Sequence, residues 1–169
     1  LCYILSFCRG ITRPFHRKSL PAEPRKILFL QISEMGSIVI AASMFKKIQN
    51  MYPGCEMFFL TFKANRCAVD VLKIIPEENV FTISSTNMIS FASSAARAVR
   101  EIRKRKIDTV IDLELFARFS AILSLFSGAV RRVGYHRHTS EGLYRGNFLT
   151  HPVMLNLSLI HISEPTRPY

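Results

Sequence analysis

The segment that decides the fold reads Lys26-Ile-Leu-Phe-Leu-Gln-Ile-Ser-Glu-Met-Gly-Ser37. Its first seven residues are almost continuously apolar, which is typical of a β-strand covered on both faces. The glycine allows a tight turn, and the residues beyond it change to helical spacing. A buried strand that leads through a turn into a helix predicts the opening unit of a parallel α/β sheet.

The same alternation continues along the chain. The first predicted helix ends at Pro53-Gly54, and its apolar stripe consists of Ile38, Ala42, Phe45, Ile48 and Tyr52. Further strands are predicted over 57–62, 80–84, 107–113 and 131–135, and further helices over 65–75, 88–105 and 117–126. Five strands that alternate with helices predict an α/β fold, a Rossmann-like doubly wound parallel sheet.

The 88–105 helix has three readable features. Asn87 is placed to cap it by accepting a backbone N–H. The residues expected to face inward are Met88, Phe91, Ala95, Val99 and Ile102. Its last turns carry a basic run, Arg100, Arg103, Lys104, Arg105 and Lys106. We interpret this run as a solvated face whose cations oppose the negative end of the helix dipole, in preference to a ligand patch.

The composition is that of a folded, basic domain. Of 169 residues, 49% are hydrophobic and 21% are charged, which is far from the signature of disorder, and the length suits one domain. The formal charge is +11, of which the first 25 residues carry +4 and the rest +7. Such a charge suits nucleic acid, anionic lipid or phosphorylated substrates, and does not choose among them.

The cysteines indicate a reduced environment. Cys2, Cys8, Cys55 and Cys67 form no CxxC pair and have no histidine at metal-ligand spacing. This argues against a zinc site or a disulfide framework and favours the cytosol.

Residues 1–24 are expected to form a basic, membrane-proximal arm and a linker. The first eight residues are apolar apart from Ser6, and basic residues follow at once. This apolar segment is too short to cross a bilayer, which takes about 20 residues in a helix, but it is consistent with the end of a longer anchor whose basic flank marks the cytoplasmic side. A disordered basic arm is the alternative. Pro14, Pro21 and Pro24 predict an extended linker, so the folded domain should begin near Arg25.

The C-terminal residues 157–169 are expected to be non-native. Leu157 to Arg167 reads LSLIHISEPTR, which resembles the translation of a transposase adapter used in sequencing libraries. We therefore assign no chemistry to His161 or Glu164. The native domain, residues 25–156, is expected to be a truncated part of a longer protein.

Candidate site residues follow the strands, because ligands bind outside the carboxyl ends of the strands in such sheets. After the first strand comes the 33–37 turn, where the N–H groups of a helix N-terminus point toward the ligand side. Its single glycine does not match GxGxxG, which argues against NAD or FAD. Glu34 and Ser37 are candidates for a ligand site, or they simply cap the helix.

Two more groups of polar residues follow the fourth and fifth strands. Asp112, Glu114 and Arg118 favour a chemical role, although an Asp112–Arg118 ion pair that shapes the loop explains them equally well. The 135–147 loop is rich in hydrogen-bond donors, and the candidates for a clamp on phosphate or a carboxylated sugar are Arg132, Arg137 and Arg145. His136 and His138 lack a third ligand at suitable spacing, so we expect neither a metal nor a cofactor.

Several segments in combination resemble glycosyltransferase family 9, which includes the heptosyltransferases of the lipopolysaccharide core. The segments are 26–40, Tyr52-Pro-Gly54, Ile107-Asp-Thr-Val-Ile-Asp-Leu113 and Ser127-Gly-Ala-Val-Arg-Arg-Val-Gly-Tyr135. The resemblance implies the N-terminal, acceptor-binding half of a GT-B enzyme, with a nucleotide-diphospho-sugar donor bound by a C-terminal domain that lies outside this chain. It implies inverting sugar transfer to a lipid-linked surface glycan at the cytoplasmic face of the bacterial inner membrane. The chain alone is expected to be inactive.

The resemblance departs at Ser37, where the heptosyltransferases usually carry an aspartate proposed as the general base. A serine cannot hold a proton at neutral pH as a carboxylate can, so Glu34 and then Glu141 become the candidates for catalysis. The residues assigned to acceptor binding are Gly36, Ser37, Asp112, Glu114, Arg118, Arg132, His136, Arg137 and Arg145. We expect the 33–37 and 136–147 loops to open into one shared cleft.

Two other functions compete with sugar transfer. A non-catalytic basic module that binds anionic lipid or polysaccharide at a membrane surface is the alternative, supported by the N-terminal arm and the missing aspartate. Nucleic acid is not expected as a partner, because the cations lie at helix ends and are not interleaved with exposed aromatic residues.

Overall fold

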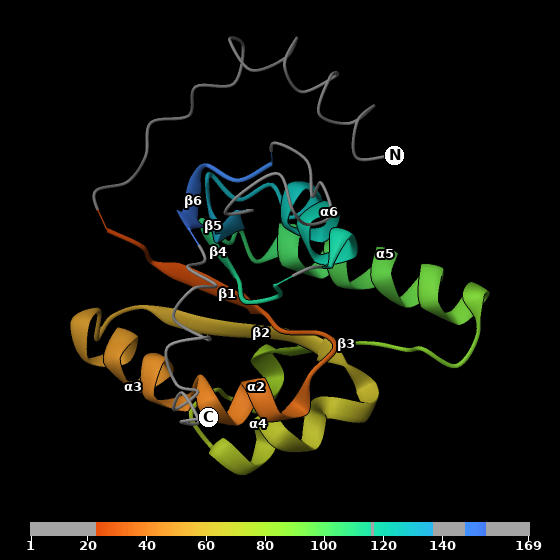
Figure 1. Ribbon diagram of the computed structural model, residues 1–169, viewed down its shortest axis with the longest axis horizontal. Coiled ribbons are helices and arrows are strands. Elements are labelled where there is room, and N and C mark those ends of the chain that lie inside the picture. Colours follow the sequence, from red (N-terminus) through yellow and green to blue (C-terminus); the bar gives the residue numbers. More distant parts are fainter. Residues whose placement is uncertain (1–22, 116, 137–147, 155–169) are drawn as a thin grey trace, which may run out of the picture.

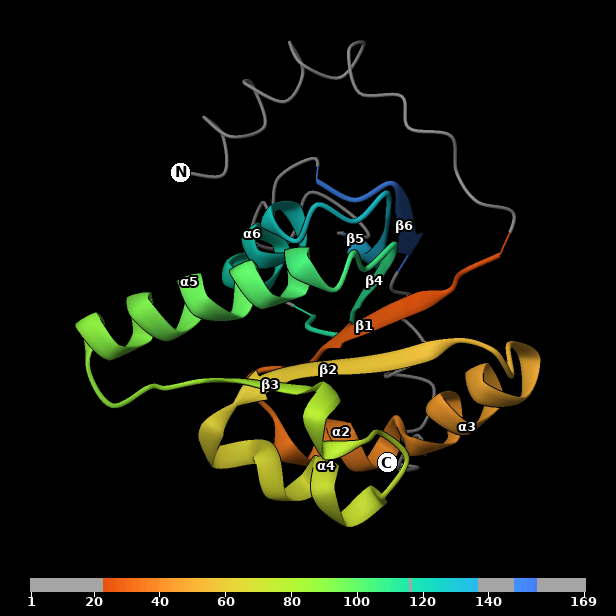
Figure 2. The same ribbon diagram turned by 180° about the vertical axis from the view of Figure 1, so that it is seen from behind.

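The computed structural model describes residues 23–115, 117–136 and 148–154. Its centre is a six-stranded parallel sheet with the strand order β3-β2-β1-β4-β5-β6, and helices cover both faces (Figures 1 and 2). The strands are β1 (Lys26–Leu30), β2 (Glu56–Phe62), β3 (Val80–Ile83), β4 (Thr109–Asp112), β5 (Arg131–His136) and β6 (His151–Met154). The helices are α2 (Met35–Ile40), α3 (Ala42–Met51), α4 (Arg66–Leu72), α5 (Met88–Lys104) and α6 (Arg118–Phe126), with short 3-10 turns η2 (Lys63–Asn65) and η3 (Glu77–Asn79). The predicted α/β doubly wound fold is confirmed.

Strand β1 lies at the centre of the sheet, between β2 and β4. Its side chains alternate between the two faces, as the period of two in a strand requires. Leu28 and Leu30 pack on the face covered by α5 and α6, while Ile27 and Phe29 pack on the face covered by α2, α3 and α4. All four side chains are buried, which confirms that the apolar run belongs to a strand covered on both faces.

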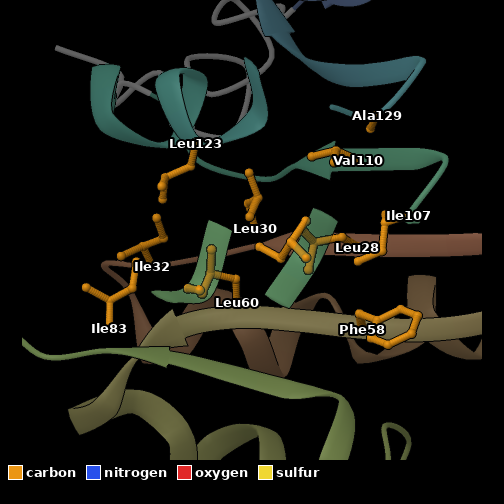
Figure 3. Close-up of a cluster of buried hydrophobic side chains, with 12 residues drawn as sticks. Leu28, Leu30, Ile32, Phe58, Leu60, Ile83, Ile107, Val110, Leu123 and Ala129 are labelled. Carbon is orange, nitrogen blue, oxygen red and sulfur yellow. The ribbon is translucent and has the colours of Figure 1, made fainter. Parts of the chain in front are cut away.

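Each face of the sheet has its own apolar core. On the α5–α6 side, Figure 3 shows Leu28 and Val110 of the sheet in one cluster with Leu123 of α6. On the other side, Phe45 of α3 packs against Phe29 and Phe59, with ring centroids 4.8 and 5.8 Å away. Burial of such large rings stabilises the packing of α3 on this face of the sheet.

The start of the sheet is tied by one carboxylate. Asp108, just before β4, accepts the backbone N–H groups of Arg25 and Lys26, each at 2.9 Å from Oδ2. This pair of hydrogen bonds fixes where β1 begins relative to β4, and the register then places Leu30 opposite Asp112 at the far end.

Three sequence-based expectations need correction. A sixth strand, β6, which was not predicted, extends the sheet beside β5; as an edge strand it tolerates Pro152, because one of its sides needs no N–H. The helix predicted before Pro53 is two helices that meet at Ala41, after the β-branched run Ile38 to Ile40, which disfavours helix. Gly36 lies inside the first turn of α2 and makes no left-handed turn.

Helix α5 confirms its predicted cap and corrects one inward residue. The Asn87 side chain accepts the N–H of Ser90 at 2.7 Å. Met88, however, is 81% exposed, because the first turn lies outside the apolar cluster that Phe91 joins. At the other end, Arg103 donates to the carbonyl of Phe126 at 2.7 Å and so satisfies the last turn of α6. Within the described ranges, no helix has the length and apolarity that crossing a membrane requires.

Candidate functional site

A cleft of about 470 Å³ opens at the carboxyl edge of the sheet, between β1 and β4. Strand order reverses there, since β2 and β3 lie on one side of β1 and β4 to β6 lie on the other. Parallel α/β sheets place their ligands at such a switch point. The lining residues are Gln31, Ser33, Glu34, Ser37, Ile40, Ala41, Met44, Leu113, Glu114, Leu115, Ala117 and Tyr135.

Glu114 holds the two sides of the cleft together. Its buried carboxylate accepts the backbone N–H groups of Ile32 and Ser33 at 2.6 and 2.7 Å through Oε1, and the Ser33 hydroxyl at 2.7 Å through Oε2. The Gln31 amide adds a longer bond of 3.3 Å. Hydrogen bonds to a charged group are stronger than neutral ones, so Glu114 fixes the turn after β1 onto the loop after β4.

Glu34 and Ser37 form a hydrogen-bonded pair in the cleft. The Ser37 hydroxyl donates to Glu34 Oε2 at 2.6 Å. Glu34 stands at the cap position of α2, but its side chain makes no cap hydrogen bond. The capping interpretation is therefore wrong for Glu34, and the structure leaves this exposed carboxylate at the cleft wall with Ser37 beside it.

Asp112 lies behind the cleft and does not line it. Its carboxylate is buried and accepts the Ser120 hydroxyl at 2.9 Å and the N–H of Glu114 at 3.1 Å. No ion pair joins Asp112 to Arg118 in the part of the chain that the structure describes. Arg118 is exposed at the start of α6. Asp112 thus shapes the loop through hydrogen bonds, and the predicted ion pair is wrong.

Arg132 serves the sheet, outside the cleft lining. Its guanidinium is buried and donates to the carbonyls of Phe148, at 2.7 Å, and Ala129. These bonds join β5 to the segment that leads into β6. Of the other predicted residues, His136 ends β5, while Arg137, Glu141 and Arg145 lie outside the described residues. Their roles stay predictions.

The cleft joins segments that follow three strands. The 33–37 turn, residues 113–115 and the end of β5 meet there through Glu34, Glu114 and Tyr135. The 137–147 loop lies outside the described residues, so the cleft that it was expected to share with the 33–37 turn stays a prediction.

Sequence reasoning missed the apolar wall of the cleft. Ile40, Ala41 and Met44 line one side, and they come from the break between α2 and α3 that periodicity did not predict. Gln31, which directly follows β1, was a readable signal of the cleft, since it interrupts the apolar run from Ile27 to Ile32. The described lining thus combines two carboxylates and several hydroxyl or amide groups with an apolar wall, and it includes no Lys or Arg.

The fold and the cleft together define the class of protein: this is a Rossmann-like domain with the fold of a GT-B glycosyltransferase. No model of a protein family matches the sequence, and no curated protein matches it. The similar proteins are solved structures.

Three solved structures illustrate the likeness. The first is the E. coli heptosyltransferase WaaC with ADP-2-deoxy-2-fluoro heptose, at a TM-score of 0.63 and 13% identity over 78% of this chain. The second is a family 9 glycosyl transferase from Veillonella parvula DSM 2008, at 0.65 and 15% over 82%. MurG from Acinetobacter baumannii follows at 0.51 and 14% over 86%. The chain spans 42%, 37% and 50% of these proteins, respectively. The likeness shows the fold, and it agrees with the resemblance to glycosyltransferase family 9 found in the motifs.

Proposed function

We propose that the chain is the acceptor-binding half of a glycosyltransferase. The reaction is transfer of a sugar, such as heptose, from a nucleotide-diphospho-sugar to a hydroxyl of a lipid-linked surface glycan, with inversion at the anomeric carbon. The observation that carries the proposal is the cleft between β1 and β4, which presents the Glu34 carboxylate beside the Ser37 hydroxyl at the ligand edge of a GT-B-like domain. The donor is suggested by the WaaC structure, which holds an ADP-sugar analogue.

The proposed base is Glu34. Its carboxylate removes the proton of the acceptor hydroxyl as that oxygen bonds to the anomeric carbon, and the bond to the nucleotide diphosphate breaks with its electron pair. Ser37 engages Oε2 of Glu34, which restricts the side chain and leaves Oε1 for the acceptor. Glu114 supports this geometry by fixing the preceding turn through the N–H groups of Ile32 and Ser33.

The remaining parts of the proposal concern the whole protein. Because the chain spans about two-fifths of WaaC, the donor is assigned to a second domain, and the chain by itself is proposed to be inactive. A lipid-linked acceptor places the reaction at the cytoplasmic face of the bacterial inner membrane, and the charge of +11 favours a peripheral association with anionic lipid.

The test is sugar transfer by the complete protein to a lipid-linked acceptor. Loss of a general base lowers rates by about 10²–10⁴-fold, so Glu34→Gln should reduce kcat within that range. Glu78→Gln is the matched control, because Glu78 is exposed beside the start of β3, at the opposite edge. If Glu34→Gln and Glu141→Gln both keep the full rate, the base assignment is wrong.

The function itself is tested separately. If the complete protein binds no nucleotide sugar by calorimetry and still sediments with anionic vesicles, a non-catalytic membrane module replaces the enzyme.

A further inference from the structure

Four of the exposed large apolar side chains that the structure describes lie in segments that follow strands at the carboxyl edge of the sheet, the edge that holds the cleft. They are Met35 at the start of α2, Met88 and Ile89 at the start of α5, and Leu115 in the loop after β4. The two on α5 are the most exposed of the four, at 81% and 84%. Two adjacent large side chains that stay in water cost free energy, so a contact that covers them would be stabilising.

The first turn of α5 projects as a tip beyond the sheet. In both views α5 extends past the ends of the strands on the side toward which β1 runs (Figures 1 and 2). The tip is braced, because Asn87 caps the helix through the N–H of Ser90, and the N–H of Ser84 donates to the Ser94 hydroxyl at 3.0 Å. A braced helix end holds Met88 and Ile89 outward.

We propose that this tip, Met88 and Ile89, inserts into the surface of an anionic lipid bilayer. Exposed cations stand on the same edge, Lys63 in the turn after β2 and Arg118 at the start of α6. Apolar side chains flanked by Lys and Arg match the requirements of a bilayer interface with negatively charged headgroups.

The orientation that follows serves the proposed function, on which this inference partly rests. With the tip in the bilayer, the carboxyl edge of the sheet, which holds the cleft, lies on the side of the domain that is nearest to the membrane and its lipid-linked acceptor. A second domain that closes over the cleft would sit at the β1/β4 switch point. The tip instead follows β3, the outermost strand on its side of the sheet. The lipid surface is therefore the favoured occupant.

The absence of tryptophan from the sequence makes a direct test possible. Ile89→Trp installs a single fluorophore at the tip. Val71→Trp, the control, installs one away from the tip, near the C-terminal end of α4, where Val71 is 77% exposed. With vesicles of phosphatidylglycerol and phosphatidylcholine, the Ile89→Trp chain should emit at shorter wavelength and be quenched by lipids brominated on their acyl chains. The Val71→Trp chain should show neither change.

Affinity gives a second measurement. Removing two apolar side chains from the lipid contact in Met88→Ser/Ile89→Ser should weaken vesicle binding about tenfold or more. Lys63→Glu/Arg118→Glu should weaken it about tenfold or more on anionic vesicles, with little effect on neutral ones. Both variants change exposed residues, so circular dichroism should show an unchanged fold.

Three results would overturn the proposal. The first is vesicle binding without any change in the Ile89→Trp emission, which would assign the contact to another surface. The second is no binding to vesicles of either composition. The third concerns the Ile89→Trp variant of the complete protein: the tryptophan already emits at short wavelength before lipid is added, and brominated lipid does not quench it. That result would show that the second domain covers the tip.

The proposed function can fail independently of the tip. With a water-soluble acceptor fragment, Met88→Ser/Ile89→Ser should keep the full transfer rate, and only transfer to a vesicle-embedded acceptor should fall. A protein that transfers no sugar and still inserts the tip would refute the enzyme and leave the membrane contact standing.

Discussion

Replacing Glu114 by alanine should destabilise the domain more than replacing any exposed carboxylate by alanine. The substitution removes the acceptor of the Ile32 and Ser33 N–H groups, at 2.6 and 2.7 Å, and of the Ser33 hydroxyl, at 2.7 Å. A hydrogen bond to a charged group contributes about 1.5–3 kcal/mol, and a buried donor without a partner costs about 1–3 kcal/mol. Ser33 is exposed, so water can replace part of what its groups lose, and we expect the free energy of unfolding to fall by about 3 kcal/mol, which is less than the sum of the three bonds.

The assay is urea unfolding followed by far-ultraviolet circular dichroism. With a denaturant slope of about 1.5–2 kcal/mol/M for a domain of this size, the midpoint should fall by about 1.5–2 M. Glu114→Gln keeps one oxygen acceptor, so its free energy of unfolding should fall by about half as much as that of Glu114→Ala. Glu78→Ala, at the opposite edge, should change the free energy of unfolding by no more than about 0.5 kcal/mol.

A double-mutant cycle isolates the contact with Ser33. Glu114→Ala combined with Ser33→Ala should be less destabilising than the sum of the single changes, with a coupling of about 1 kcal/mol. The reasoning is refuted if Glu114→Ala shifts stability by less than about 0.5 kcal/mol, or if the two changes are additive.

Three further outcomes are expected. Gly134→Ala should cost about 1–3 kcal/mol in urea unfolding, because its Cβ would lie 3.1 Å from Asp112 Cβ and 3.1 Å from Leu149 Cδ2; stability equal to the unsubstituted chain would contradict this packing. Asn87→Ala should cost about 1 kcal/mol by removing the cap on α5, whereas Asn87→Ser should recover most of it, and equal losses would exclude capping. Burial raises the pKa of the Cys55 thiol, so iodoacetamide labelling followed by mass spectrometry should give a midpoint at higher pH in the folded chain than in urea; the reverse order would be inconsistent with burial.

The sequence predicted the fold correctly where an apolar pattern fitted only one kind of secondary-structure element. Lys26 to Ile32 is too apolar for any exposed element, and the 3.6-residue stripe with Ile38 and Phe45 left one face to bury. Asn87 also signalled its role locally, since capping depends on neighbours three residues away. β6 was missed because a short strand with a proline is defined by its partner β5 rather than by its own residues.

The sequence by itself determined the strands β1 to β5 and the helical segments between them, and that the carboxyl ends of these strands would carry the polar residues. Only the tertiary structure decided which of those residues share a cleft. Glu114 and Ser33 are 81 residues apart and meet through hydrogen bonds across the β1/β4 junction, while Asp112 turns behind it and Arg132 serves the sheet. Local sequence patterns indicate whether a segment forms a helix or a strand and which of its residues are exposed to solvent. Contacts between distant segments depend on strand order and register, which no single segment encodes.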